Sequence, residues 1–197
     1  MKNNKKNNNQ EEESWGSFIR DVVVLFVIFV GIYYLIFSFL LSNEVVSGPS
    51  MQPTFEDGDR IISVRHAKID HSDIVILKAP DEKNALYIKR VIGMPGDKIR
   101  FTSSGQLYRN GKKVKENYLT KGKKMYSQGQ PYTTDFTTSK LLVVNHTITV
   151  PKGSYFVMGD HRNVSKDSRI LGFISKKRII GVVKVRYWPI ADFKIYN

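Results

Sequence analysis

The chain has 197 residues, which is enough for one domain or for one domain with a subdomain. It contains no cysteine, and this excludes a disulfide scaffold, a cysteine nucleophile, iron–sulfur ligation and a cysteine-based zinc site. The net charge is +13, from 31 basic and 18 acidic residues. By itself this charge favours an anionic partner, such as nucleic acid, a lipid surface or an anionic wall polymer.

An apolar segment without any charge occupies residues 22–41. A helix of this length spans about 30 Å, the thickness of the hydrocarbon core of a bilayer. The segment is also longer than the roughly 7–15 apolar residues of a cleavable signal peptide. We therefore expect an uncleaved transmembrane anchor, rather than a buried strand or helix of a soluble core.

The charges that flank this segment predict its orientation. Basic residues near a membrane span remain on the cytoplasmic side. Four precede the span, and only one follows it within residues 42–61; they are Lys2, Lys5, Lys6, Arg20 and then Arg60. We expect residues 1–21 to be a cytoplasmic tail and residues 42–197 to be extracytoplasmic. Four acidic residues balance the tail, so the whole net charge of +13 lies on residues 42–197, which favours a lipid headgroup surface over nucleic acid.

Short runs rich in β-branched and aromatic residues dominate the chain after residue 43 and alternate with turn residues. The runs are residues 60–66, 73–79, 85–93, 98–102, 141–150, 155–159 and 179–188. The dipeptide Asn110-Gly111 between two further short runs predicts a type I′ hairpin. The pattern predicts a mostly β, antiparallel sheet or barrel, with the polar residues 103–140 as a less regular insertion or cap.

The first candidate for chemistry is SGPSMQPT, residues 47–54. Its prolines and glycine force an irregular loop in which the hydroxyl of Ser50 can point outward as a nucleophile; the alternative is a turn-rich linker. A serine needs a base, and the histidines are His66, His71, His146 and His161. The cluster Asp70-His71-Ser72-Asp73 resembles a metal site or a triad, but neighbouring residues of a strand point to opposite faces and would not converge. We therefore expect a solvated turn there. Lysine is the other base that serine nucleophiles use.

Lys89 lies within the apolar run 85–93, with Tyr87 and Val91 on its own face of the expected strand. Burial of a lysine lowers its pKa, as a general base requires, although an edge-strand lysine that blocks aggregation is the alternative. A third segment, GDHRNVSKDSR (159–169), holds many hydrogen-bonding groups. Its Asp and Arg side chains can stabilise a loop by bidentate hydrogen bonds. The alternative is an ordinary surface loop.

Taken together and in this order behind one anchor, SGPSMQPT, YIKRVIGMPGD (87–97) and GDHRNVSKDSR resemble the bacterial type I signal peptidases over roughly residues 15–190. The resemblance implies a membrane-bound serine endopeptidase that cleaves N-terminal signal peptides from exported preproteins after small residues. It implies an antiparallel β catalytic core with a β cap subdomain, at about residues 103–150 of this chain, and no metal or cofactor. The implied partners are exported preproteins and the lipid bilayer, near the secretion translocon, without nucleic acid.

The resemblance also implies roles for individual residues. Ser50 matches the nucleophile, Lys89 the general base, and Ser165 a serine that hydrogen-bonds and orients the lysine. Supporting positions of the three motifs are matched by Gly48, Met51, Pro53, Arg90, Asp160 and the ion pair of Asp167 with Arg169. Gly48 stands where some members carry a serine that helps to form the oxyanion hole, and His161 stands where the family often has asparagine. The second donor of the oxyanion hole is therefore open.

Two other classes of protein remain as alternatives. One is an inactive or regulatory membrane-anchored β protein, which the presence of both Ser50 and Lys89 disfavours. The other is a basic extracellular module that binds wall polymer or anionic lipid. Such a module explains the charge of +13 but leaves the three motifs unexplained.

Overall fold

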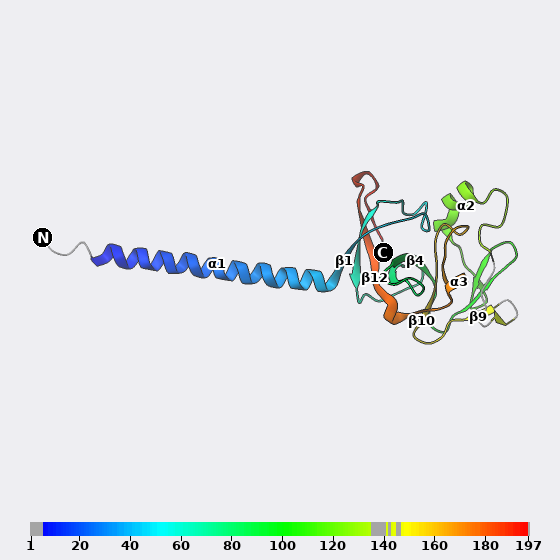
Figure 1. The fold of residues 1–197 in the computed structure, drawn as a ribbon, viewed down its shortest axis with the longest axis horizontal. Coiled ribbons are helices and arrows are strands. Elements are labelled where there is room, and N and C mark those ends of the chain that lie inside the picture. Colours follow the sequence, from blue (N-terminus) through cyan, green and yellow to red (C-terminus); the bar gives the residue numbers. More distant parts are fainter. Residues whose placement is uncertain (1–5, 135–140, 142, 145–146, 197) are drawn as a thin grey trace. The chain divides into compact units, whose positions relative to one another are not determined.

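The computed structural model describes residues 6–134, 141, 143–144 and 147–196, and the chain divides into two units, Met1–Leu40 and Leu41–Asn197. The first unit is the helix α1 (Lys6–Leu40) (Figure 1). Within it, Trp15–Leu40 is long and apolar enough to cross a membrane, and none of this stretch is buried inside the protein. The helix ends one residue before the expected end of the span, because Leu41 already opens a strand.

The second unit is built on an antiparallel sheet with the strand order β1-β2-β12-β3-β4-β10-β11, to which β13 is added beside β12. Its strands are β1 (Leu41–Val45), β2 (Arg60–Arg65), β3 (Ile74–Lys78), β4 (Leu86–Gly93), β10 (Ser154–Met158), β11 (Ile174–Ser175), β12 (Ile179–Trp188) and β13 (Lys194–Ile195). The predicted mostly β, antiparallel fold is confirmed. The sequence did not indicate β1, β11 and β13, because each is short or largely exposed.

A second antiparallel sheet has the order β7-β6-β5-β9-β8. Its strands are β5 (Lys98–Phe101), β6 (Leu107–Arg109), β7 (Lys112–Lys113), β8 (Val143–Val144) and β9 (Thr147–Thr149). Asn110 and Gly111 have φ angles of 52° and 78° and join β6 to β7, as the predicted type I′ hairpin requires. This second sheet begins with β5 at Lys98, before the insertion expected from residue 103, because the turn after β4 leads directly into β5.

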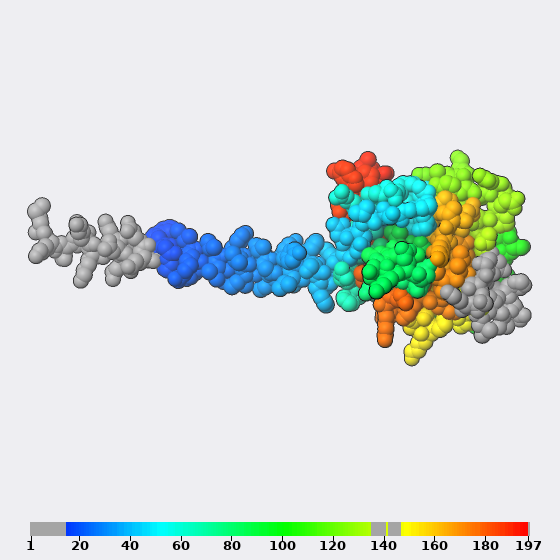
Figure 2. Space-filling model, in the orientation of Figure 1, coloured from blue at the N-terminus to red at the C-terminus, as the bar shows by residue number. Residues whose placement is uncertain are grey.

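Short helices occupy the connections. They are η1 (Asn117–Leu119), α2 (Thr120–Tyr126), α3 (Ser168–Leu171), η2 (Lys176–Arg178) and η3 (Ile190–Asp192). The segment from the end of β12 through η3 to β13 projects from the surface as a hairpin (red in Figures 1 and 2). Its exposed apolar side chains are Trp188, Ile190, Phe193 and Ile195.

Buried side chains lie on both faces of the main sheet. Along β3, Ile74 and Ile76 join one cluster, whereas Val75 and Leu77 join another, as the alternation of side chains along a strand dictates. A third cluster, which includes Ile92 and residues of β5 and β9, joins the two sheets. The strand β4 pairs with β3 on one side and with β10 on the other, so it lies in the interior of the sheet.

Candidate active site

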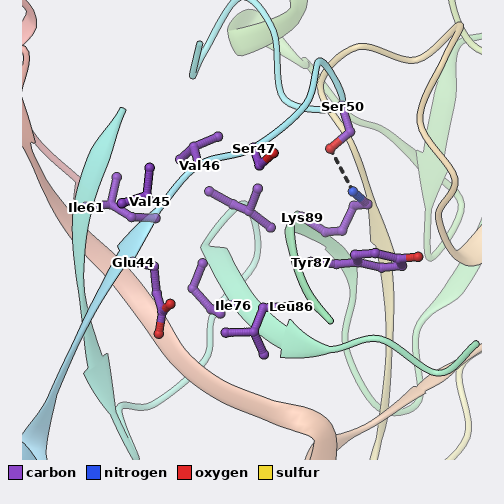
Figure 3. Close-up of a pocket in the computed structure, with 11 residues that line it drawn as sticks. Glu44, Val45, Val46, Ser47, Ser50, Ile61, Ile76, Leu86, Tyr87 and Lys89 are labelled. Atoms are coloured by element: carbon purple, nitrogen blue, oxygen red, sulfur yellow. Dashed lines mark hydrogen bonds between the residues drawn. The ribbon is translucent and has the colours of Figure 1, made fainter. Parts of the chain in front are cut away.

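The nucleophile candidate and the base candidate meet directly. Lys89 Nζ donates a hydrogen bond of 2.8 Å to Ser50 Oγ (Figure 3). Lys89 lies on β4, where its backbone is opposite Val75 of β3, and β10 pairs with the other side of β4. Lys89 is therefore not on an edge strand, and the alternative of a lysine that protects a sheet edge is wrong.

Buried apolar side chains hold the loop that carries Ser50 in place. Met51 and Phe55 are fully buried, and the Met51 carbonyl accepts hydrogen bonds from the N–H groups of Thr54 and Phe55. Gly48 has a φ of +82°, a left-handed conformation that glycine adopts without strain. Its N–H donates to Asp57 at 2.8 Å. The loop is therefore tight, and it directs the hydroxyl of Ser50 toward Lys89.

Burial changes the proton affinity of Lys89. Only 3% of the residue is exposed, and this desolvation lowers the pKa of Lys89 to about 8, although the charges of Asp167 and Asp160 act in the opposite direction. With this pKa about one molecule in ten carries a neutral Lys89 at pH 7, against about one in 2,500 for a lysine in water. The side chain is thus able to accept a proton near neutral pH.

Asp160 connects the three sequence motifs. Its carboxylate accepts two hydrogen bonds from Arg90, at 2.8 and 2.5 Å, and one from Thr54 Oγ1 at 2.6 Å. Arg90 is next to Lys89 on β4, and Thr54 belongs to the loop of Ser50. Asp160 is completely buried, so these charged bonds form away from water, where they are strong. They fix the loop of Ser50 relative to β4.

The rest of the 159–169 loop has its own buried ion pair. Asp167 accepts hydrogen bonds from Arg169 Nε and Nη2, both at 2.9 Å, and from the N–H of Gly159 at 3.1 Å. A carbon added to Gly159 would collide with both Ser165 Oγ and the carbonyl oxygen of Ser50. Glycine at this position therefore allows Ser165 and the Ser50 backbone to lie side by side.

The hydroxyl of Ser165 does not make the bond that the resemblance implies. It is buried and has no hydrogen-bond partner among the residues that the structure describes, and Lys89 Nζ donates to Ser50. The geometry brings Ser165 into the site, beside Ser50, but it does not place a hydrogen bond between Ser165 and Lys89.

A small cavity of about 90 Å³ opens beside Ser50 and Lys89 (Figure 3). It is lined by Glu44, Val45, Val46, Ser47, Ser50, Ile61, Ile76, Leu86, Tyr87, Ile88 and Lys89. The cavity wall is about equally polar and apolar, with the two reactive side chains at one end, and it suits a small side chain.

The histidines have other contacts. His71 Nε2 lies 2.6 Å from Asp97 Oδ2, in a turn, as expected for a side chain outside the strands. His161 Nδ1 lies 3.2 Å from the carbonyl oxygen of Pro49. His66 lies on a turn after β2, and His146 lies outside the described residues. Among the described residues, the base that is hydrogen-bonded to the Ser50 hydroxyl is Lys89.

Several residues that support the site come from the segment between β7 and β8 of the second sheet, and sequence reasoning missed them. Glu116 accepts a hydrogen bond of 2.6 Å from Arg162, and the ring of Tyr118 lies 4.1 Å from the Arg90 guanidinium. Tyr132 donates to the carbonyl of Asp160 at 2.8 Å. Nothing local in the sequence marks these residues, because their partners are 28 or more positions away.

The sequence of this chain is similar to that of known proteins. The family model described as "Signal peptidase, peptidase S26" matches residues 19–188. A signal peptidase IB of Staphylococcus aureus (strain MRSA252) is 39% identical over 186 residues, which is 92% of this chain and 93% of the relative. A signal peptidase I of Bacillus caldolyticus is 42% identical over 159 residues, 79% of this chain and 84% of the relative.

A solved structure agrees with this result. The crystal structure of a signal peptidase I from Enterococcus faecalis V583 superposes with a TM-score of 0.51 and is 37% identical. The match covers 59% of this chain and 97% of that structure. Both the sequence and the fold are thus similar to proteins of one family.

Proposed function

We propose, from the premise that this chain belongs to the signal peptidase family S26, that Ser50 and Lys89 are the catalytic dyad with which it cleaves preproteins. The chain is a serine peptidase of this family, and its substrates are preproteins that carry signal peptides. The observation that carries the dyad is the bond of 2.8 Å between Lys89 Nζ and Ser50 Oγ, with Lys89 buried from water.

In the proposed acylation step, neutral Lys89 accepts the proton of Ser50 while Ser50 Oγ attacks the scissile carbonyl. The carbonyl carbon becomes tetrahedral, and its oxygen takes the negative charge. Collapse of this intermediate expels the amine of the mature protein, which takes a proton from the Lys89 ammonium. The signal peptide remains as an ester on Ser50. Water that Lys89 deprotonates then hydrolyses the ester and restores the serine.

The oxyanion requires hydrogen-bond donors that are already in place. The N–H of Ser50 has no acceptor among the described residues, so it is available as one donor. The N–H of Gly48 is already bonded to Asp57. The hydroxyl of Ser47 lines the cavity beside Ser50 and is a second candidate for the oxyanion hole.

Ser165 is proposed to support the dyad after the proton has moved. Its buried hydroxyl lacks a partner within the described part of the chain, where Lys89 is bonded to Ser50. An ammonium has three protons to donate, and a hydroxyl oxygen can accept one of them. Ser165 thus supplies a partner for the charged state of Lys89, which its buried surroundings otherwise disfavour.

The substrate is proposed to lie extended beside residues 44–47, with a small side chain in the cavity. The helix α1 is proposed to anchor the enzyme in the bilayer, with residues 1–21 in the cytoplasm and residues 42–197 outside. This location brings the site to signal peptides as they emerge, close to the secretion translocon.

The test is preprotein cleavage by the purified full-length chain in detergent. Ser50→Ala and Lys89→Arg should both fold and both lose nearly all activity, because arginine remains protonated and cannot act as the base. Wild-type activity should rise with pH through an ionisation near 8. The control is Lys83→Arg at an exposed position, which should retain normal activity. Normal cleavage by a folded Lys89→Arg enzyme would exclude the dyad.

A further inference from the structure

His161 makes two contacts to the loop of Ser50. Its backbone N–H donates to the carbonyl oxygen of Ser50 at 3.1 Å, and its ring Nδ1 lies 3.2 Å from the carbonyl oxygen of Pro49. A carbonyl oxygen accepts but does not donate, so Nδ1 carries the proton of the second bond. Only 9% of His161 is exposed.

The bond to the Pro49 carbonyl acts on the peptide unit that contains the Ser50 N–H, the proposed donor to the oxyanion. The carbonyl of Pro49 and the N–H of Ser50 belong to the same planar peptide unit and point in opposite directions. A donor that holds the Pro49 oxygen therefore also sets the direction of the Ser50 N–H. Gln52 N–H donates to the same oxygen at 3.1 Å from within the loop, and His161 adds a second donor from outside it.

The ring of His161 is itself held by the helix α2. Tyr126 stacks on it with a centroid separation of 4.0 Å and an interplanar angle of 22°. Asn163, two residues after His161, donates to the carbonyl of Tyr126 at 2.8 Å, so a second bond joins this loop to Tyr126. In the same helix, a carbon added to Gly122 would lie 3.2 Å from Pro53 and 2.7 Å from the hydroxyl of Tyr132. The helix α2 thus packs against the loop of Ser50 as well as against His161.

We propose that His161 is a positioning residue that aims the Ser50 N–H at the oxyanion, with Tyr126 of α2 holding its ring in place. This inference rests on the proposed function of Ser50 and Lys89 and assigns His161 no part in proton transfer. An oxyanion donor is effective when its direction is set before the reaction, so loss of the Nδ1–H should slow the chemical step and leave substrate binding nearly unchanged.

Two substitutions separate the hydrogen bond from the ring. His161→Phe keeps a ring to stack on Tyr126 but removes the donor. His161→Asn loses the ring but keeps an N–H donor at about the position of Nδ1. We expect His161→Phe to lower kcat about 10- to 100-fold with KM within about twofold, since a lost oxyanion donor costs about 10²–10³ in kcat. His161→Asn should restore kcat to within about threefold of wild type.

The experiment measures kcat, KM and the pH profile of preprotein cleavage for the full-length chain in detergent, with thermal unfolding as the check on folding. The ionisation near 8 should be unchanged in His161→Phe, because it belongs to Lys89. If His161→Phe does not fold, His161→Gln replaces it, since its amide lies further out than Nδ1 and should show the same loss of kcat.

The stacking has its own pair of variants. Tyr126→Ala should lower kcat by about threefold or more, and Tyr126→Phe should not. The inference would be overturned if His161→Phe, or its replacement His161→Gln, kept the kcat of wild type. It would also be overturned if His161→Phe and His161→Asn lost the same activity. Both outcomes apply while wild type still cleaves. Failure of wild type to cleave, or cleavage by Ser50→Ala, would instead overturn the proposed function.

Discussion

At the scale of single residues, the candidate site depends on a lysine in surroundings that oppose its charge. Lys89 is buried on an interior strand, and desolvation lowers its pKa to about 8. The same environment that makes the amine available as a base also makes the folded state less stable than it would be with an apolar side chain. Function and stability therefore oppose each other at this position.

We expect Lys89→Met to abolish cleavage and to raise the free energy of unfolding at pH 7 by about 3 kcal/mol, since burial lowers the pKa of Lys89 from 10.5 to about 8 and one pKa unit corresponds to about 1.4 kcal/mol. The folded pKa lies below the unfolded value, so the unfolded chain binds more protons between about pH 8 and 10.5. The destabilisation of wild type is thus complete below pH 8 and disappears as the pH approaches 10.5. Denaturant titration in detergent at both ends of this range measures it; a gain that does not depend on pH would contradict the assignment.

At the scale of elements, buried charges hold the 159–169 loop against its neighbours. Asp160 pairs with Arg90 of β4, and Asp167 pairs with Arg169 within the loop. Arg162 pairs with Glu116 at 2.6 Å, just before η1, and neither side chain is more than 3% exposed. This last pair joins the loop of the active site to the segment between β7 and β8 of the second sheet.

We expect Glu116→Gln to lower the free energy of unfolding by about 3 kcal/mol, because it leaves the buried guanidinium of Arg162 without its charged partner. Glu82→Gln is the matched control, since Glu82 is exposed, and it should change stability by no more than about 0.5 kcal/mol. Denaturation midpoints of the two variants at neutral pH give the comparison. Equal midpoints would mean that water or another group satisfies Arg162.

At the scale of the whole molecule, charge and hydropathy are divided along the chain. The apolar stretch Trp15–Leu40 contains only Arg20 and Asp21 as charged residues, and the residues after it carry the net charge of +13. This division suits a basic domain that works close to an anionic lipid surface. The proposed orientation rests on the basic residues that precede the apolar stretch.

Protease treatment of intact protoplasts tests this orientation. Residues 42–197 should be digested, and an epitope tag fused to the N-terminus should be protected, because positive charges retain the tail in the cytoplasm. Lysed protoplasts are the control, in which the tag should also be lost. Protection of the C-terminal unit in intact protoplasts would reverse the proposed topology.

The sequence by itself determined much of this protein, because the relevant patterns are local. The uncharged span, the β-rich runs and the Asn110-Gly111 turn depend on neighbouring residues, and each corresponds to an element of the structure. The three motifs were sufficient to indicate the family, which the comparisons confirm. The roles of Ser50 and Lys89 were likewise expected from these motifs and remain predictions.

Only the tertiary structure decided which distant groups meet. The contact of Ser50 with Lys89 spans 39 positions, and that of His161 with Pro49 spans 112. Whether Lys89 is buried depends on β10 pairing beside β4, a long-range event that no local pattern encodes. Among the described residues Ser165 Oγ has no hydrogen-bond partner, which the motif alone did not indicate. Folding brings these groups together because burying the apolar faces of two sheets determines where each loop must lie.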